Sequence, residues 1–263
     1  SIDRARKEDG LVKRSFMGFS VDAISLEETA AIAAAAIAAR RPMVHCSLNA
    51  LKVVEARRDP QVRRMLEDFD LLTADGASVA WGLRLLAGVP SERVAGVDLM
   101  ARLLAEGAAR GWRFFLLGAS PEVSATLPSR IESAFPGVLV AGTHHGYFDT
   151  VEEGRIVGLI RDSAADVLFV GMPSPRKERF LLEHRNTLAV PFAMGVGGGL
   201  DLLAGKTRRA PVWMRRSGLE WSYRVLQEPR RLAGRYFVTN LRFAGLFARE
   251  LLAIRRSGRD VSC

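Results

Sequence analysis

The sequence predicts an α/β fold in which a mostly parallel sheet is covered by helices on both faces. From Met43 to Met194, apolar runs of strand length alternate with longer segments of helical periodicity, a pattern typical of parallel sheets. The run from Trp112 to Leu117 is apolar almost throughout, as expected of a strand buried on both faces. The 263 residues are 48% hydrophobic and 25% charged, which suits one large domain with or without an appendage.

The expected elements follow one another with short connections. Ser15 to Val21 is expected to form an edge strand. A helix from Ser25 to Arg40 begins with Glu27 and Glu28, which suit the positive end of the helix dipole. Further strands are expected at 43–48, 71–73, 112–117, 138–141, 167–170 and 189–194. Helices are expected at 49–57, 60–69, 77–87, about 98–110, 121–135, 151–161 and 174–186.

The positive charge is concentrated at the end of the chain. The net charge is +9 and the pI is near 10.3. Residues 205–263 contain 14 Lys and Arg against 4 Asp and Glu, whereas residues 1–204 contain 24 against 25. We therefore expect a core at 1–204 and a helical, arginine-rich appendage at 205–263. The partner of such an appendage is a polyanion or an anionic membrane surface, although a merely solvated helix face has the same composition.

Two stripes run along the appendage at helical spacing. Arginines recur every seven residues from 235 to 256. Another face would carry Phe237, Leu241, Ala244, Ala248 and Leu252. A basic amphipathic helix of this kind lies in a membrane interface or packs its apolar face on the core, and the sequence leaves both open.

Cysteine and histidine usage argues against a metal site or a disulfide framework. Cys46 and Cys263 are far apart, and the four histidines lack zinc-ligand spacing. Asp68-Phe69-Asp70 spells the D-x-D with which some sugar-nucleotide transferases hold a divalent ion. Because it falls at a helix end with Phe69 toward the core, we favour a structural role. We expect no metal, no cofactor, no signal peptide and no membrane-spanning segment, in a reducing cytoplasm.

Asp75 lies where a buried strand gives way to a helix. Such a carboxylate serves either as a helix N-cap or as a general base, and its position alone leaves both open. Other polar residues also follow expected strands. They are Ser47, Asn49, Tyr147, residues 173–178 and Asp201. Because the carboxyl ends of parallel strands meet at one edge, these residues together predict a site.

A glycine-rich stretch, Gly195 to Gly199, follows the last expected strand, so its amides could approach a phosphate closely. It departs from the dinucleotide fingerprint because Leu200 stands where the third glycine belongs. A nucleotide-dependent oxidoreductase is therefore disfavoured. The other alternative is a protein that binds nucleic acid through the basic appendage. The near-neutral core and the lack of a recognised nucleic-acid motif count against it.

Several motifs jointly resemble the WecG/TagA/CpsF family of bacterial glycosyltransferases, from about Ser15 to Tyr236. In chain order they are T-A-D-G, G-V-D-L, H-G-Y-F, G-M-P-S-P-R-K-E, G-V-G-G-G-L-D-L-L-A-G, R-A-P and L-E-W-S-Y-R-V-L-Q-E-P-R-R. The resemblance implies a Rossmann-like core that transfers a sugar, with inversion and without a metal ion, from a UDP-sugar. The acceptor it implies is a polyprenyl-diphosphate-linked monosaccharide in polysaccharide assembly, at the inner face of the cell membrane, where the protein would be peripheral. Whether the chain forms a homo-oligomer stays open.

The resemblance also implies roles for individual residues. Asp75 would be the general base, and Arg93 would neutralise the diphosphate as UDP leaves. Ser47 and Asn49 match a T-x-N pattern that lines the site. Tyr147 and Asp201 would hold the nucleotide.

Two further features concern phosphate groups. Lys177 stands where the family usually has Gln, and it would bind the diphosphate or the carboxylate of an acidic sugar. Appendage arginines in the family meet the lipid diphosphate, and guanidinium groups suit phosphate oxygens. The candidates here are Arg224, Arg230, Arg231 and Arg235.

Overall fold

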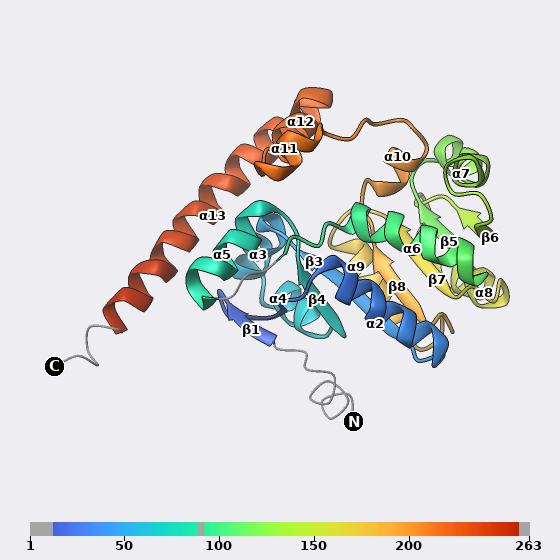
Figure 1. The fold of residues 1–263 in the computed structure, drawn as a ribbon, viewed down its shortest axis with the longest axis horizontal. Coiled ribbons are helices and arrows are strands. Elements are labelled where there is room, and N and C mark those ends of the chain that lie inside the picture. Colours follow the sequence, from blue (N-terminus) through green and yellow to red (C-terminus); the bar gives the residue numbers. More distant parts are fainter. Residues whose placement is uncertain (1–12, 89–91, 258–263) are drawn as a thin grey trace.

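The computed structural model describes residues 13–88 and 92–257, without the side chains of Ala87, Arg216, Arg231 and residues 254–257. Its strands are β1 (Lys13–Phe16), β2 (Phe19–Asp22), β3 (Met43–Leu48), β4 (Leu71–Ala74), β5 (Arg113–Gly118), β6 (Leu139–His144), β7 (Val167–Gly171) and β8 (Phe192–Gly195). They form one sheet in the order β1-β2-β4-β3-β8-β7-β5-β6, in which only the β1–β2 pair is antiparallel within the described chain. The predicted mostly parallel sheet is confirmed (Figure 1).

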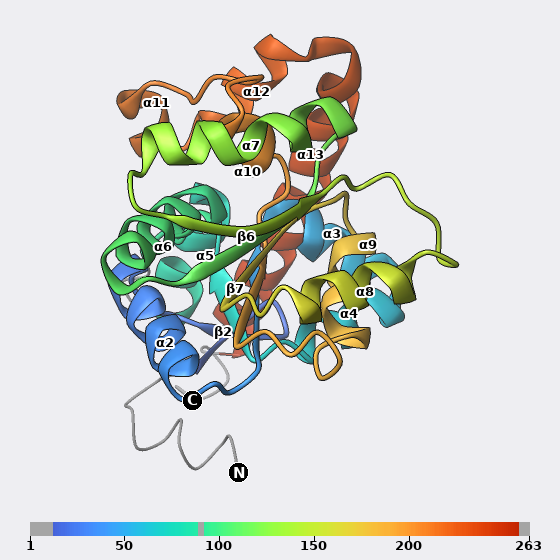
Figure 2. The same cartoon turned by 90° about the vertical axis from the view of Figure 1, so that its right-hand side faces the viewer.

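Helices cover both faces of the sheet, and each face has its own hydrophobic core (Figure 2). One face packs against α2 (Leu26–Ala38), α6 (Gly96–Arg110), α7 (Pro121–Ala134) and the short α10 (Gly199–Leu203). The other face packs against α3 (Ala50–Arg58), α4 (Pro60–Glu67), α5 (Ala77–Ala87), α8 (Glu153–Asp162) and α9 (Arg176–Glu183). These bounds agree with the predicted alternation to within a few residues.

The expected edge strand at Ser15–Val21 is a hairpin instead. β1 and β2 pair with Phe16 opposite Phe19, so only Met17 and Gly18 form the turn. Both have positive φ, 49° and 82°, as hairpin turns that match the strand twist require. Methionine is an unusual residue at such a position, which is why the turn is not evident from the sequence. The buried Met17 side chain packs in the core beside these strands.

The start of α2 follows its sequence signal closely. The Ser25 side chain accepts a hydrogen bond from the backbone N–H of Glu28, and the Glu28 carboxylate accepts one from the Ser25 backbone. This reciprocal capping box satisfies two N–H groups that the first helical turn leaves without partners. The predicted helix start at Ser25 is confirmed.

The D-x-D segment has the structural role that we favoured. Phe69 is buried, and the Asp70 carboxylate accepts a hydrogen bond from the backbone N–H of Val44 at 2.9 Å. Arg185 forms an ion pair with Asp70 at 3.2 Å and also donates to the carbonyl of Asp68. These contacts join the starts of β3 and β4 to the segment after α9.

The appendage is formed by α11 (Val212–Arg216), α12 (Glu220–Gln227) and α13 (Pro229–Ser257). α13 packs along α3 and α5 (Figure 1), with Leu232, Thr239 and Phe243 buried. The expected apolar stripe faces away from the core. Its members Phe237, Leu241, Ala244, Ala248 and Leu252 are all exposed. Packing of that stripe on the core, one of the two alternatives, is therefore excluded. In the described chain, no helix is both long and apolar enough to span a bilayer.

Candidate active site

Strand register brings the central site residues to one level. Leu48 on β3 lies opposite Ala74 on β4, so Asn49 and Asp75 leave the sheet side by side. The backbone N–H of Asp75 donates to the carbonyl of Leu48 at 2.8 Å. β8 borders β3 on its other side. The ends of β4, β3 and β8 therefore form the centre of the predicted edge.

Asp75 is not a helix cap. The N-cap residue of α5 is Gly76, and no side chain in the described part of the chain caps this helix. The carboxylate of Asp75 is thus not engaged by the helix that follows it. Burial raises the pKa of this carboxyl, while the charges of Arg93 and Arg224 act to lower it. The net pKa is above the usual aspartate value, which favours a role as a proton acceptor.

Arg93 lies among acidic partners next to Asp75. Its Nη2 is 2.9 Å from Glu220 Oε2 on α12 and 3.6 Å from Asp98 Oδ2 on α6. Asp98 also contacts two arginines of the appendage segment, Arg209 and, at 3.9 Å, Arg215. Ion pairs beside the site therefore join the core to the appendage.

The appendage approaches Asp75 through the turn between α11 and α12. Gly218 in this turn has φ 77°, and a Cβ there would lie only 2.5 Å from the Cβ of Ala77 at the start of α5. Glycine is needed at this position for both reasons. The close approach brings Glu220 and Arg224 near enough for their charges to act on Asp75.

The other three predicted arginines of the appendage lie elsewhere or are not described. Arg235 stacks over the ring of Tyr236 at 5.7 Å, and its charge acts on Glu55 of α3. Arg230 is exposed at the start of α13. The side chain of Arg231 lies outside the described residues. Arg224, in contrast, lies near enough to Asp75 for its charge to act on that carboxyl group.

Ser47 and Asn49 differ in availability. The Asn49 side chain caps α3 by accepting from the backbone N–H of Lys52 at 3.1 Å. The buried hydroxyl of Ser47 has no hydrogen-bond partner among the described residues. It lies beside Gly96, where a Cβ would be 3.6 Å from Ser47 Oγ and 3.6 Å from the carbonyl oxygen of Gly195. A buried hydroxyl without a partner is available to a ligand.

Lys177 is part of a buried ionic network. Its Nζ lies 2.8 Å from Glu178 Oε1 and contacts Ser174 Oγ. Lys52 reaches the same carboxylate oxygen at 3.1 Å and also donates to the carbonyl of Ser47 at 2.7 Å. Two ammonium groups thus share one carboxylate beneath the site. Binding of substrate by Lys177 stays a prediction.

The network keeps its charges because its members are paired. Burial opposes ionisation of Glu178, but Lys52 and Lys177 outweigh it and lower the pKa of Glu178 to about 2. Burial also opposes the charge of Lys52, but Cys46 and Glu178 raise the pKa of Lys52 above its usual value. For Lys177, burial and the charge of Lys52 prevail and lower the pKa. Lys177 is therefore the lysine of this network whose protonated, positively charged form is less favoured.

Tyr147 and Asp201 lie toward the other end of the sheet edge. Tyr147 follows β6, the last strand of the sheet, and its side chain is 73% exposed. Arg176 of α9 holds this loop by donating to the carbonyls of Gly146 and Phe148. Asp201 lies on α10, 3.6 Å from Lys206. Among the residues that the structure describes, no contact joins these two to Asp75, and their nucleotide-binding roles stay predictions.

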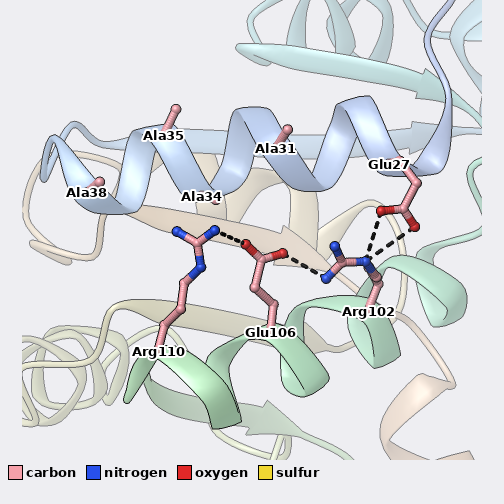
Figure 3. A pocket seen from close by; sticks show the side chains of 8 residues that line it. All are labelled: Glu27, Ala31, Ala34, Ala35, Ala38, Arg102, Glu106 and Arg110. Atoms are coloured by element: carbon pink, nitrogen blue, oxygen red, sulfur yellow. Dashed lines mark hydrogen bonds and ion pairs between the residues drawn. The ribbon is translucent and has the colours of Figure 1, made fainter.

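Two other features of the surface lie apart from this edge. A groove between α2 and α6 is lined by alanines and by an alternating row of Glu27, Arg102, Glu106 and Arg110 (Figure 3). Among the described residues, one group has potential metal-ligand atoms within 4.8 Å of one another, namely Glu153, Glu183 and His184. Neither set shares a residue with the cluster around Asp75.

Sequence reasoning missed Lys52 and Glu220. Lys52 interrupts the apolar run of α3, and a lysine in an otherwise buried stretch is a signal of a paired charge. Glu220 belongs to the quoted L-E-W-S-Y-R motif, but nothing in the sequence pairs it with Arg93, 127 positions earlier.

Comparison with protein families matches residues 14–257 to the "Glycosyl transferase WecG/TagA/CpsF family". The match covers the core and all of α13, and so extends beyond the segment in which the motifs were found. The fold agrees with the resemblance noted in the sequence. The chain belongs to the WecG/TagA/CpsF family of glycosyltransferases.

Proposed function

We propose that this glycosyltransferase moves a sugar from a UDP-sugar to a polyprenyl-diphosphate-linked monosaccharide, with inversion at the anomeric carbon. The product would serve the assembly of a surface polysaccharide or exopolysaccharide. Family membership supports glycosyl transfer over the two alternative functions, nucleic-acid binding and oxidoreduction. The nature of donor and acceptor rests on the sequence resemblance.

In the proposed reaction, Asp75 takes the proton of the acceptor hydroxyl. The hydroxyl oxygen forms a bond to the anomeric carbon of the donor while the bond from that carbon to the diphosphate of UDP breaks. Both electrons of the broken bond leave with UDP. Attack from the side opposite the leaving group inverts the anomeric configuration. Arg93 and Arg224 would stabilise the charge that grows on the diphosphate, the part that a divalent ion plays in other transferases.

The observation that carries this proposal is the local environment of the Asp75 carboxylate. Its carboxylate does not cap α5, burial raises its pKa, and two arginines act on it. A base and positive charge are thus combined at one point of the strand edge. Ser47, with its unpartnered hydroxyl, is available to bind a sugar or phosphate oxygen beside them.

We further propose that α13 brings the enzyme to an anionic membrane surface, at its cytoplasmic face, where a lipid-linked acceptor resides. Phe237, Leu241 and Leu252 are exposed on one side of this helix, and Arg242 and Arg249 are exposed as well. Exposed apolar residues next to arginines suit the interface between lipid tails and anionic headgroups. Trp213 and Leu226 add exposed apolar surface on α11 and α12.

The test is sugar transfer from a panel of UDP-sugars to polyprenyl-diphosphate-linked N-acetylglucosamine and glucose, with EDTA present. Wild-type protein is expected to transfer one sugar, and Asp75→Asn to lose about 10²- to 10⁴-fold in kcat, because a general base contributes that much. Asp98→Asn is not a suitable control because Asp98 contacts Arg93, so Asp162→Asn, an exposed change on α8, serves instead. Full activity of Asp75→Asn would contradict the assignment of the base.

A further inference from the structure

Arg93 and Glu220 form an ion pair at the place where donor phosphate is expected. Arg93 lies between α5 and α6 in the core, and Glu220 begins α12 in the appendage. Their closest atoms are 2.9 Å apart. Both side chains are more than four-fifths buried. The pair therefore joins the two parts of the chain near enough to Asp75 for both charges to act on it.

Asp98 differs from Glu220 in its dependence on Arg93. Asp98 lies 3.6 Å from Arg93 but is also held by Arg209 and Arg215. Among the described residues, Glu220 forms an ion pair with Arg93 alone. If Arg93 turned to another anion, Asp98 would keep two arginines, whereas Glu220 would be left without its partner. Glu220 is thus the group that a competing anion displaces.

We propose that Glu220 is an internal anion that occupies Arg93 until the diphosphate of the donor replaces it. Binding of the donor would then turn the side chain of Glu220 away from Arg93, while the ion pairs of Asp98 with Arg209 and Arg215 keep the appendage beside the site. This inference rests on the proposed function, because it requires a diphosphate at Arg93. It assigns Glu220 as a positioning residue and not as a catalytic one.

The local charges are consistent with such an exchange. Arg93, Arg209, Arg215 and Arg224 face three carboxylates, namely Asp75, Asp98 and Glu220. The cluster therefore carries one net positive charge while Glu220 is present, and two once it has moved away. Two positive charges match the two negative charges on the diphosphate of a UDP-sugar, and a buried arginine forms strong bonds with phosphate oxygens.

Glu220 also acts on the proposed base. Its negative charge raises the pKa of Asp75, whereas Arg93, Arg224 and Lys52 act in the opposite direction. Displacement of Glu220 by a diphosphate would replace one negative neighbour by another, so the base keeps an anion nearby in both states. In a variant that lacks the Glu220 charge, no anion takes its place near Asp75 before the donor binds. The pH dependence of the free enzyme therefore reports on Glu220 independently of UDP affinity.

The experiment measures UDP binding to the full chain by calorimetry, and kcat/KM as a function of pH, for wild type and Glu220→Gln. Glutamine keeps the size of the side chain and removes its charge. We expect Glu220→Gln to bind UDP about three- to tenfold more tightly, as removal of a competing ion pair implies. We also expect the acid limb of kcat/KM to move to lower pH, because loss of a negative neighbour lowers the pKa of Asp75.

Glu250→Gln is the matched control. Glu250 also joins the appendage to the core, through Arg57 at 3.5 Å on α3, but it is not one of the described residues whose charges act on Asp75. It should change neither UDP affinity nor the acid limb. Glu220→Asp keeps the charge and should leave the acid limb near that of wild type.

The outcomes separate the two proposals. A wild type that binds no UDP would overturn the proposed donor, and this inference with it. If the wild type binds UDP but Glu220→Gln binds it equally or less tightly, the inference alone is overturned. Thermal unfolding of each variant shows whether a loss of binding reflects a loss of folded protein.

Discussion

The charge of Asp75 depends on neighbours that come from three parts of the chain. Burial at the end of β4 raises its pKa, and Glu220 raises it further, while Arg93, Arg224 and Lys52 lower it. A general base must be ionised before it can accept a proton. Activity is therefore expected to rise with pH through the pKa of Asp75, which lies above that of an ordinary aspartate.

Replacement of Arg224 by glutamine removes one of the charges that favour ionised Asp75. The pKa of Asp75 should rise, so the acid limb of log kcat against pH should move to higher pH. The rate at its maximum should also fall, because Arg224 is proposed to stabilise the leaving diphosphate. Arg230→Gln, an exposed arginine at the start of α13, is the control and should leave the limb in place. An unmoved limb in Arg224→Gln would exclude an electrostatic role for this residue at Asp75.

Glu178 forms ion pairs with two buried lysines, so its removal should destabilise the fold. Glu178→Gln leaves Lys52 and Lys177 without a counter-charge, which we expect to cost about 3 to 5 kcal/mol in the free energy of unfolding. Lys177→Gln should cost less, because Lys52 and Glu178 remain paired at 3.1 Å. Urea unfolding at pH 7 measures both. Glu183→Gln changes an exposed residue at the end of α9, the helix that carries Lys177 and Glu178, and should have little effect.

The same carboxyl group predicts a pH dependence of stability. Its pKa is lowered from 4.5 to about 2 in the folded chain. The stabilisation is therefore present above the unfolded pKa and is lost as the pH falls from about 4.5 toward 2. In Glu178→Gln this contribution is absent, so the variant should lose less stability than wild type over that interval. Equal losses in both proteins would contradict the prediction.

Which site residues the sequence reveals depends on how far apart they are in the chain. Ser47, Asn49 and Asp75 follow strands, and parallel strands bring their ends together without further information. The pairing of Arg93 with Glu220, or of Lys52 with Glu178, depends on how a helix packs after more than 100 intervening residues. No periodicity or spacing encodes such a contact. It follows from tertiary packing alone.

At the scale of elements, strands and helices are predictable where composition and caps agree. Met43–Leu48 is predicted with its observed bounds, and α2 begins after Ser25 as its capping signal requires. The β1–β2 hairpin is missed because Met17 adopts a positive φ that its residue type does not favour. For α13 the sequence predicts a helix with an apolar stripe but not which face packs. The packed face is formed instead by Leu232, Thr239 and Phe243.

Replacement of two phenylalanines of α13 should therefore affect different properties, one the stability of the fold and the other binding to membranes. Phe243 is 7% exposed and packs in the core beside α3 and α5, whereas Phe237 is 70% exposed. Phe243→Ala is expected to lower the free energy of unfolding by about 3 to 5 kcal/mol. Phe237→Ala should change it by less than about 0.5 kcal/mol and should weaken binding to vesicles instead. Chemical denaturation and vesicle flotation measure the two effects, and a reversed order would show that the faces are misassigned.

At the scale of the whole molecule, the excess positive charge is concentrated in one part of the chain. The near-neutral core holds the strand edge, and the appendage carries most of the excess positive charge along α11 to α13 (Figure 1). α13 is attached to the core through one face only, and it presents apolar residues and arginines on its other sides. Membrane binding would then place the Asp75 edge, which α12 also borders, close to a lipid-linked acceptor.

If the appendage binds an anionic surface through its charge, removal of exposed arginines should weaken binding stepwise. Arg230→Gln, Arg242→Gln and Arg249→Gln combined should cost roughly 1 kcal/mol for each residue near the surface, or about a hundredfold in total. The measurement is sedimentation with vesicles containing anionic lipid, at low and high salt. Wild-type binding should weaken with salt, because screening reduces attraction between exposed charges.

The control for this variant removes the same charge from the core. Arg130, Arg155 and Arg161 are exposed on α7 and α8, and their combined replacement by glutamine should leave vesicle binding nearly unchanged. If both triple variants lost affinity equally, net charge alone and not the position of α13 would determine binding. Tighter binding of the wild type to DNA than to anionic vesicles would instead favour a nucleic acid as the partner of the appendage, because both ligands attract arginine but only the bilayer also accepts Phe237 and Leu241.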